Sequence, residues 1–86
     1  MADITSPTRR QVWMGNVPMH MTEASVIGWM AQLKVPVPWK VLVRQASNGR
    51  SQWAVATFET ISDAQHLMSL KLLWPGDGYM VLRQAQ

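Results

Sequence analysis

The stretch QVWMGNV, residues 11–17, is rich in residues that favour β-strands, and Pro18 follows it directly. Proline has no backbone N–H to donate to a sheet, so this pattern predicts a strand that ends before it. The strand carries a tryptophan, Trp13, whose direction decides which face of the sheet is buried. Val12 and Met14 compete with Trp13 for the buried face, because neighbouring side chains on a strand point to opposite sides. The local pattern leaves that choice open.

Hydrophobic periodicity predicts a helix after this strand and a hairpin after the helix. Thr22 is a good N-cap, and apolar residues then recur at helical spacing, which predicts a helix over about residues 23–34. The VPVP sequence ends the helix, since proline cannot continue it. Alternating residues predict strands at residues 39–45 and 51–58, and the Asn-Gly pair between them predicts a hairpin turn.

A second helix and a final strand complete the predicted order. Ser62 with Gln65 three positions later has the spacing of a capping box, which predicts a helix that begins at Ser62. Residues 79–84, YMVLRQ, predict the last strand. The β-α-β-β-α-β order predicts an α+β ferredoxin-like sandwich, in which a four-stranded antiparallel sheet of order 4-1-3-2 carries both helices on one face. The other face is open to solvent, and any function is expected there.

The composition indicates one small globular domain. The chain has 86 residues, 48% of them hydrophobic, so residues 10–86 are expected to form one modest core after a flexible leader at residues 1–9. It has no cysteine, which removes disulfides and thiolate zinc sites, and no apolar run of the ~20 residues that cross a bilayer. The polar start is not typical of a signal peptide. We expect an intracellular monomer, nuclear or cytoplasmic.

Two short motifs within this order resemble those of the RNA recognition motif (RRM) family. The stretch VWMGNV, residues 12–17, fits the family's first-strand hexapeptide at every position, with tryptophan in place of the usual phenylalanine or tyrosine. The stretch SQWAVATF, residues 51–58, keeps the aromatic Trp53 and the final phenylalanine of the third-strand octapeptide. The resemblance covers about residues 10–85. The octapeptide departs from the family pattern at three positions, Ser51, Gln52 and Val55.

The resemblance implies the register of the sheet and the ligand. In the family register Trp13 and Trp53 point outward on the two central strands, where they would stack the bases of single-stranded RNA. Side chains of the two flanking strands share that face, and the positive ones would contact phosphates. Single-stranded DNA offers the same chemistry and stays open as a ligand. The residues expected to bind RNA are Trp13, Trp53, Val55, Lys40, Leu42, Arg44, Arg50, Tyr79, Arg83 and Arg10.

A protein-interaction module with the same fold is the alternative that the sequence leaves open. Aromatic residues are enriched at protein interfaces as well as at RNA-binding surfaces. Val55 is aliphatic where the family usually has an aromatic platform, and the octapeptide begins with the neutral Ser51. Both departures favour a protein partner on the Trp-rich face or on a helical face. The basic side chains of Lys40, Arg44 and Arg83 favour RNA.

The other three tryptophans are expected to pack rather than to bind a ligand. Trp29 falls in the apolar stripe of the first predicted helix, which places it in the core. Trp39 opens the second predicted strand, and Trp74 precedes a turn, so both are expected to be packing residues or loop anchors.

The sequence gives no support for an enzyme, a metal site or a cofactor. The five acidic residues are scattered over the predicted tail, helix starts, strand end and turn, so no pair of carboxylates for acid–base catalysis is visible. His20 and His66 have no third metal ligand nearby in the predicted fold. Acylphosphatases share the βαββαβ order, but their Gly-rich, Arg-containing loop after the first strand is replaced here by PMHMTE, residues 18–23. We therefore expect no enzymatic activity.

Overall fold

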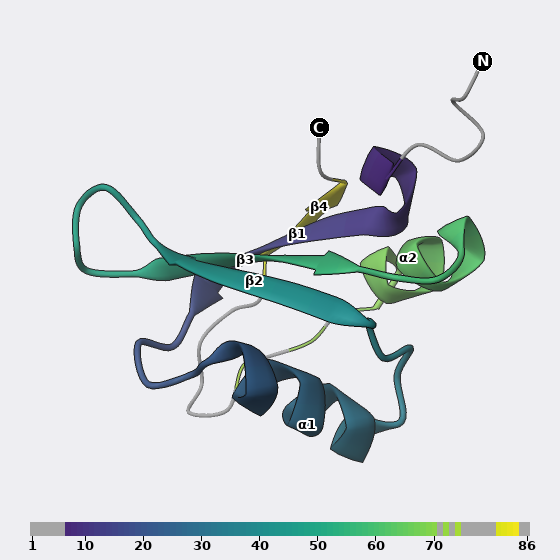
Figure 1. Ribbon diagram of the computed structural model, residues 1–86, viewed down its shortest axis with the longest axis horizontal. Helices are drawn as coiled ribbons and strands as arrows, with labels where there is room; N and C mark the ends of the chain where they lie inside the picture. Colours follow the sequence, from purple (N-terminus) through teal and green to yellow (C-terminus); the bar gives the residue numbers. More distant parts are fainter. Residues whose placement is uncertain (1–6, 71, 73, 75–80, 85–86) are drawn as a thin grey trace.

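The computed structural model describes residues 7–70, 72, 74 and 81–84 of the chain (Figure 1). Its four strands form one antiparallel sheet in the order β2-β3-β1-β4, which is the predicted order 4-1-3-2 counted from the other edge. The elements along the chain are η2 (Pro7–Arg10, a 3-10 helix), β1 (Gln11–Val17), α1 (Glu23–Leu33), β2 (Lys40–Gln45), β3 (Gln52–Thr57), α2 (Ile61–Met68) and β4 (Val81–Gln84).

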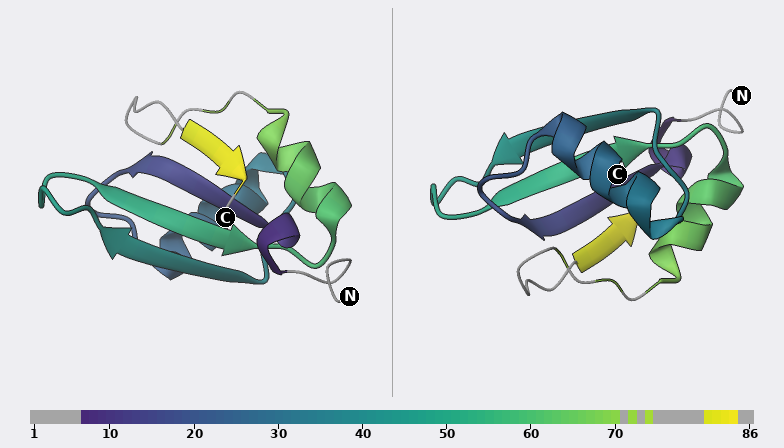
Figure 2. Two further views of the ribbon diagram at one scale, coloured as in Figure 1. Left: turned by 90° about the horizontal axis from the view of Figure 1, so that it is seen from above. Right: turned by 90° about the horizontal axis from the view of Figure 1, so that it is seen from below.

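One face of the sheet is covered and the other is open. Seen from below, α1 crosses in front of the strands, whereas the view from above shows the strands uncovered (Figure 2). Val12 and Met14 of β1 are completely buried, and both belong to one core cluster with residues of α1 and α2. Trp13 lies between them in sequence and therefore points to the open face. The structure thus settles the choice that the local pattern left open.

The start of α1 confirms the predicted N-cap. Thr22 has an extended backbone, and its hydroxyl oxygen accepts a hydrogen bond of 3.3 Å from the backbone N–H of Ser25. Met21 before the cap and Val26 after it are both buried, as a hydrophobic staple requires. The helix ends at Lys34, whose φ of 60° is left-handed and stops further helical hydrogen bonding.

The start of α2 corrects the prediction. The N-cap is Thr60 rather than Ser62, because the Thr60 hydroxyl accepts a hydrogen bond of 3.0 Å from the N–H of Asp63. Asp63 also places a negative charge in the first turn, where it favours the positive end of the helix dipole. Thr60 and Asp63 are three residues apart, which is the spacing of a capping box. This box begins two residues before the one predicted from Ser62 and Gln65.

Trp74, between α2 and β4, is the largest fully buried side chain of the described residues. Its indole stacks on that of Trp29, with ring centroids 5.1 Å apart and an interplanar angle of 29°. Its Nε1–H donates a hydrogen bond of 2.8 Å to the backbone oxygen of Gly15 in β1. The position before β4 is therefore part of the core, and the expectation that Trp74 packs rather than binds is confirmed.

Glu23, the first residue of α1, contacts the edge strand β2. Its carboxylate accepts a hydrogen bond of 3.0 Å from the backbone N–H of Val43, and it lies 3.9 Å from the guanidinium of Arg44. The bond from Val43 holds the pKa of Glu23 below its ordinary value, and its own backbone N–H and Arg44 act in the same direction. The contact occupies one of the outward N–H groups that a free edge would present to another strand.

No helix among the described residues combines the length and the apolar character that crossing a membrane requires.

Candidate functional site

The open face carries two tryptophans on its central strands. The register pairs Trp13 of β1 with Val55 of β3 on one side and with Arg83 of β4 on the other. Trp53 of β3 pairs with Arg44 of β2. The side chains that alternation places on this face are Gln11, Trp13, Lys40, Leu42, Arg44, Trp53, Val55, Thr57, Val81 and Arg83.

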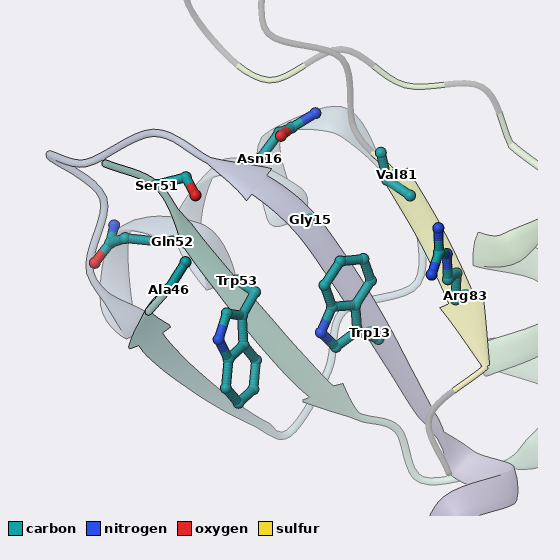
Figure 3. Close-up of a pocket in the computed structure, with 9 residues that line it drawn as sticks. All are labelled: Trp13, Gly15, Asn16, Ala46, Ser51, Gln52, Trp53, Val81 and Arg83. Carbon is teal, nitrogen blue, oxygen red and sulfur yellow. The ribbon is translucent and has the colours of Figure 1, made fainter. Parts of the chain in front are cut away.

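A shallow, open pocket of about 190 Å³ lies between the two indoles and one end of the sheet (Figure 3). Trp13, Trp53 and Arg83 are the predicted binding residues that line it. Polar side chains lie at one end of the pocket and aromatic rings at the other. The complete lining is Trp13, Gly15, Asn16, Ala46, Ser51, Gln52, Trp53, Val81 and Arg83.

The indole of Trp13 lies along β1 and covers Gly15. A Cβ atom built on Gly15 would be 2.7 Å from Cη2 and 2.8 Å from Cζ3 of this indole, closer than any real carbon contact. The guanidinium carbon of Arg83 lies over the same ring, 5.4 Å from its centroid. This distance is within the range of a cation–π interaction. Trp13 therefore has Gly15 beneath it and Arg83 above it.

A β-bulge at the end of β1 brings Asn16 to the surface. Three steps along β1, from Met14 to Val17, oppose two steps along β3, from Ala54 to Gln52. The extra residue is Asn16, which is exposed and has a left-handed φ of 60°. Asparagine tolerates this conformation better than most residues. The bulge also returns Val17 to the core, where it is 2% exposed.

Gln52 fixes the loop between β1 and α1 to this end of the sheet. Its amide nitrogen donates hydrogen bonds of 2.8 Å to the backbone oxygen of Pro18 and 3.2 Å to that of Met21. From the sequence, Gln52 is only a departure from the octapeptide. In the structure it holds the loop that follows the bulge, so it supports the pocket wall.

The remaining predicted residues lie outside the pocket lining. Lys40, Leu42, Val55 and Arg44 are on the open face but farther along it. The guanidinium of Arg44 donates a hydrogen bond of 3.0 Å to the backbone oxygen of Val43, and half of its side chain stays exposed.

Two predicted arginines lie outside the strands of the sheet, and one predicted tyrosine lies outside the described residues. Arg50 is exposed in the β2–β3 turn. Arg10 ends η2, which contacts α2, and its Nε is buried with no hydrogen-bond partner among the described residues. Tyr79 lies outside the described residues.

Six residues of the pocket were not among the predicted binding residues: Gly15, Asn16, Ala46, Ser51, Gln52 and Val81. Alternation alone could have placed Gly15 beside Trp13 and Ser51 beside Trp53, because residues two apart on a strand share a face. The signal for Asn16 was hidden, since a bulge changes the count of residues in a way that the sequence pattern does not show. Ala46 lines the pocket from the β2–β3 hairpin, and Gln52 lines it where its side chain contacts the β1–α1 loop.

The described part of the chain shows no group of three or more His, Cys, Asp or Glu side chains that could hold a metal ion.

Comparison with known proteins finds similarity in structure but not in sequence. No family model matches the chain, and the search of curated proteins found no match. The structure of the RRM3 domain of Mip6 at 1.25 Å resolution has a TM-score of 0.71, at 11% identity over 91% of this chain and 98% of that one. A second structure of the Mip6 RRM3 domain has a TM-score of 0.73, at 10% identity over 94% of this chain and 100% of that one. The chain therefore folds as an RRM-type domain.

Proposed function

We propose that the chain binds single-stranded RNA on the open face of the sheet, with bases stacked on Trp13 and Trp53. The observation that carries this proposal is the pocket between the two indoles. At about 190 Å³ it is smaller than the ~300–1,000 Å³ of pockets for drug-sized ligands, so it suits one flat ring system. The Mip6 domains with this fold are named as RRM domains, which supports the same ligand class.

Polar groups at the pocket end can contact the edge of a base. The Asn16 amide offers both donors and an acceptor, and the Ser51 hydroxyl can act as either. Both side chains line the pocket between the bulge and the start of β3. A base in this pocket would therefore have an aromatic ring against its face and hydrogen-bonding groups at its edge, as RNA recognition in single strands requires.

Arg83 competes with a base for contact with the indole of Trp13. Its guanidinium lies over the indole, but an exposed cation–π contact is worth only ~0.5–1 kcal/mol. Stacking of a base on an aromatic platform is worth ~1–3 kcal/mol. The base is therefore expected to displace the guanidinium, which is then free to contact the phosphate of the stacked nucleotide.

The flanking strand β2 adds positive charge to the same face. Lys40 is exposed, and the guanidinium of Arg44 is held by an exposed hydrogen bond to the backbone oxygen of Val43 and an exposed contact with Glu23. Such surface ion pairs contribute little, typically ~0–1 kcal/mol, so Arg44 can turn to a phosphate. Single-stranded DNA has the same phosphates and similar flat bases, and the 2′-hydroxyl lets a protein distinguish the two ligands.

The proposal is tested by titrating the protein with pools of single-stranded RNA while tryptophan fluorescence is recorded. Stacking on Trp13 or Trp53 should quench the fluorescence, and single-stranded DNA of the same sequences should be compared. Duplex RNA should quench weakly, because its bases are not splayed out. Equal quenching by duplex and single strands, or none by either, would contradict base stacking.

A protein partner on the β2 side is the second candidate. Trp39, just before β2, is 60% exposed and Leu42 is 38% exposed, so two large apolar side chains face solvent there. Exposed aromatic residues are frequent in protein interfaces. Trp39→Ala should leave RNA quenching by the open face unchanged, since Trp39 is not part of the pocket lining. Loss of RNA quenching in this variant would place the ligand on the β2 side.

Arg83→Ala should change the salt dependence of RNA binding more than the affinity itself. If Arg83 contacts one phosphate, its loss reduces the slope of log K against log salt by about 0.7. The cation that competes for Trp13 is lost as well, so the variant should bind more weakly than the parent at low salt and at least as tightly at high salt. The measurement is a set of titrations over a range of salt concentrations.

Arg83→Lys is the matched control, because it keeps the charge but loses the flat guanidinium. It should keep the parent's slope. A drop in affinity that is equal at every salt concentration in Arg83→Ala would remove Arg83 from the phosphate contacts.

A further inference from the structure

We infer that Gly15 is the residue that positions Trp13, since a side chain at Gly15 would tilt the indole out of the orientation in which it can stack a base. The part of this inference that concerns binding rests on the proposed function. The part that concerns the orientation of the ring stands on the geometry of the free protein.

Gly15 is buried although its position on β1 faces the open side of the sheet. The indole of Trp13 covers it, because residues two apart on a strand share a face. A Cβ on Gly15 would lie 2.7 and 2.8 Å from two ring atoms of Trp13 and 3.3 Å from Cβ of Val81. The Val81 contact requires that residue to move by a few tenths of an ångström, whereas the closer contacts with the ring require the ring to move.

The backbone does not require glycine at this position. Among the described residues, the glycine with positive φ is Gly49 in the hairpin turn, so Gly15 has a conformation that any residue adopts. Glycine within a strand is also less stable than alanine, since it loses more conformational freedom on folding. Its hydrogen bond with Trp74 uses the backbone oxygen, which alanine would keep. The structural feature that needs glycine here is the space taken by the indole.

The two ring atoms that approach Gly15 show that the size of the aromatic ring is the reason why position 15 needs glycine. Cη2 and Cζ3 lie at the far edge of the indole, and the shorter phenyl ring of phenylalanine has no atoms there. A tryptophan at position 13 therefore depends on glycine at position 15, but a phenylalanine would not. Trp13 and Gly15 are thus coupled, because the indole can lie in this orientation only where residue 15 has no side chain.

The test compares four proteins: the parent, Gly15→Ala, Trp13→Phe and the double variant. With glycine at position 15, the parent should bind single-stranded RNA more tightly than Trp13→Phe, since the indole gives the larger stacking area. Gly15→Ala should lose about tenfold or more in affinity, the scale of one stacking platform. With alanine at position 15 the order should reverse, so that the double variant binds more tightly than Gly15→Ala.

The reversal distinguishes positioning from simple blockage. If the alanine methyl only filled the pocket, Trp13→Phe would give no recovery in the alanine background, and this result would overturn the inference. A purely structural role would lower thermal stability, whereas Gly15→Ala should be as stable as the parent or more stable. Binding by Gly15→Ala that equals the parent's would also overturn the inference.

The indole N–H signals in a ¹⁵N-labelled sample give a readout that needs no RNA. Loss of one signal in Trp13→Phe identifies Trp13, and this signal should shift in Gly15→Ala. A parent that binds no RNA would contradict the proposed function. The positioning role would then be decided by the Trp13 signal alone: a shift in Gly15→Ala supports it, and an unmoved signal overturns it.

Discussion

Replacement of Trp74 by alanine should lower the free energy of unfolding by about 3–5 kcal/mol, the usual cost of removing a fully buried aromatic side chain. Trp74 is 1% exposed and stacks on Trp29, so its loss leaves a large cavity beneath the sheet. The buried oxygen of Gly15 also loses its donor, which adds a penalty of ~1–3 kcal/mol. Small domains have ~5–15 kcal/mol in total, so much of the variant should be unfolded at 37 °C.

Two control variants make this prediction specific. Trp74→Phe keeps part of the packing but loses the N–H, so its loss of stability should be intermediate. Trp39→Ala removes the same kind of side chain where it is 60% exposed, and should change stability by no more than about 0.5 kcal/mol. Unfolding in denaturant, followed by circular dichroism, gives all three values. A Trp74→Ala midpoint equal to that of Trp39→Ala would contradict the assignment of Trp74 to the core.

The elements with strong local signals were predictable from the sequence. The strand that contains Trp13 ends before Pro18, and α1 begins after Thr22, because proline and the N-cap act on their own neighbours. The N-cap of α2 was misplaced by two residues, since Thr60 and Ser62 are both good caps. The local pattern offers both caps, and in the structure the Thr60 hydroxyl accepts the hydrogen bond from the N–H of Asp63.

The local sequence pattern did not predict how deeply Trp74 is buried. The segment between α2 and β4 shows no hydrophobic periodicity, so the sequence could indicate that Trp74 packs but not how deeply its side chain is buried. Its depth depends on partners far away in sequence, Trp29 in α1 and Gly15 in β1. Such long-range contacts are set by the tertiary fold, which overrides local preference.

The candidate site was predictable in its aromatic residues but not in its shape. Alternation left the direction of Trp13 open, and the family register put it on the open face, where the structure has it. The pocket, however, depends on the bulge at Asn16 and on the Gln52 contact with the loop. Both are irregular features that a pattern of period two does not contain.

Removal of both stacking indoles, those of Trp13 and Trp53, should have the largest effect on RNA binding. Trp13→Ala and Trp53→Ala should each weaken binding of single-stranded RNA by ~1–3 kcal/mol, the value of one base–aromatic stack. The double variant should lose up to the sum if each indole holds its own base, and less than the sum if both contact one base in the shared pocket. The fluorescence of Trp13 and Trp53 is lost with their rings, so the titrations should use a labelled RNA.

Stability and a third tryptophan provide the controls for this experiment. Trp13 and Trp53 are partly exposed on an uncovered face, so the variants should unfold close to the parent, unlike Trp74→Ala. Trp39→Ala should bind RNA like the parent, because Trp39 lies outside the pocket lining. If Trp39→Ala weakens binding while Trp13→Ala and Trp53→Ala do not, the ligand contacts the β2 side. The two indoles would then hold no base, and this result would contradict the proposed stacking site.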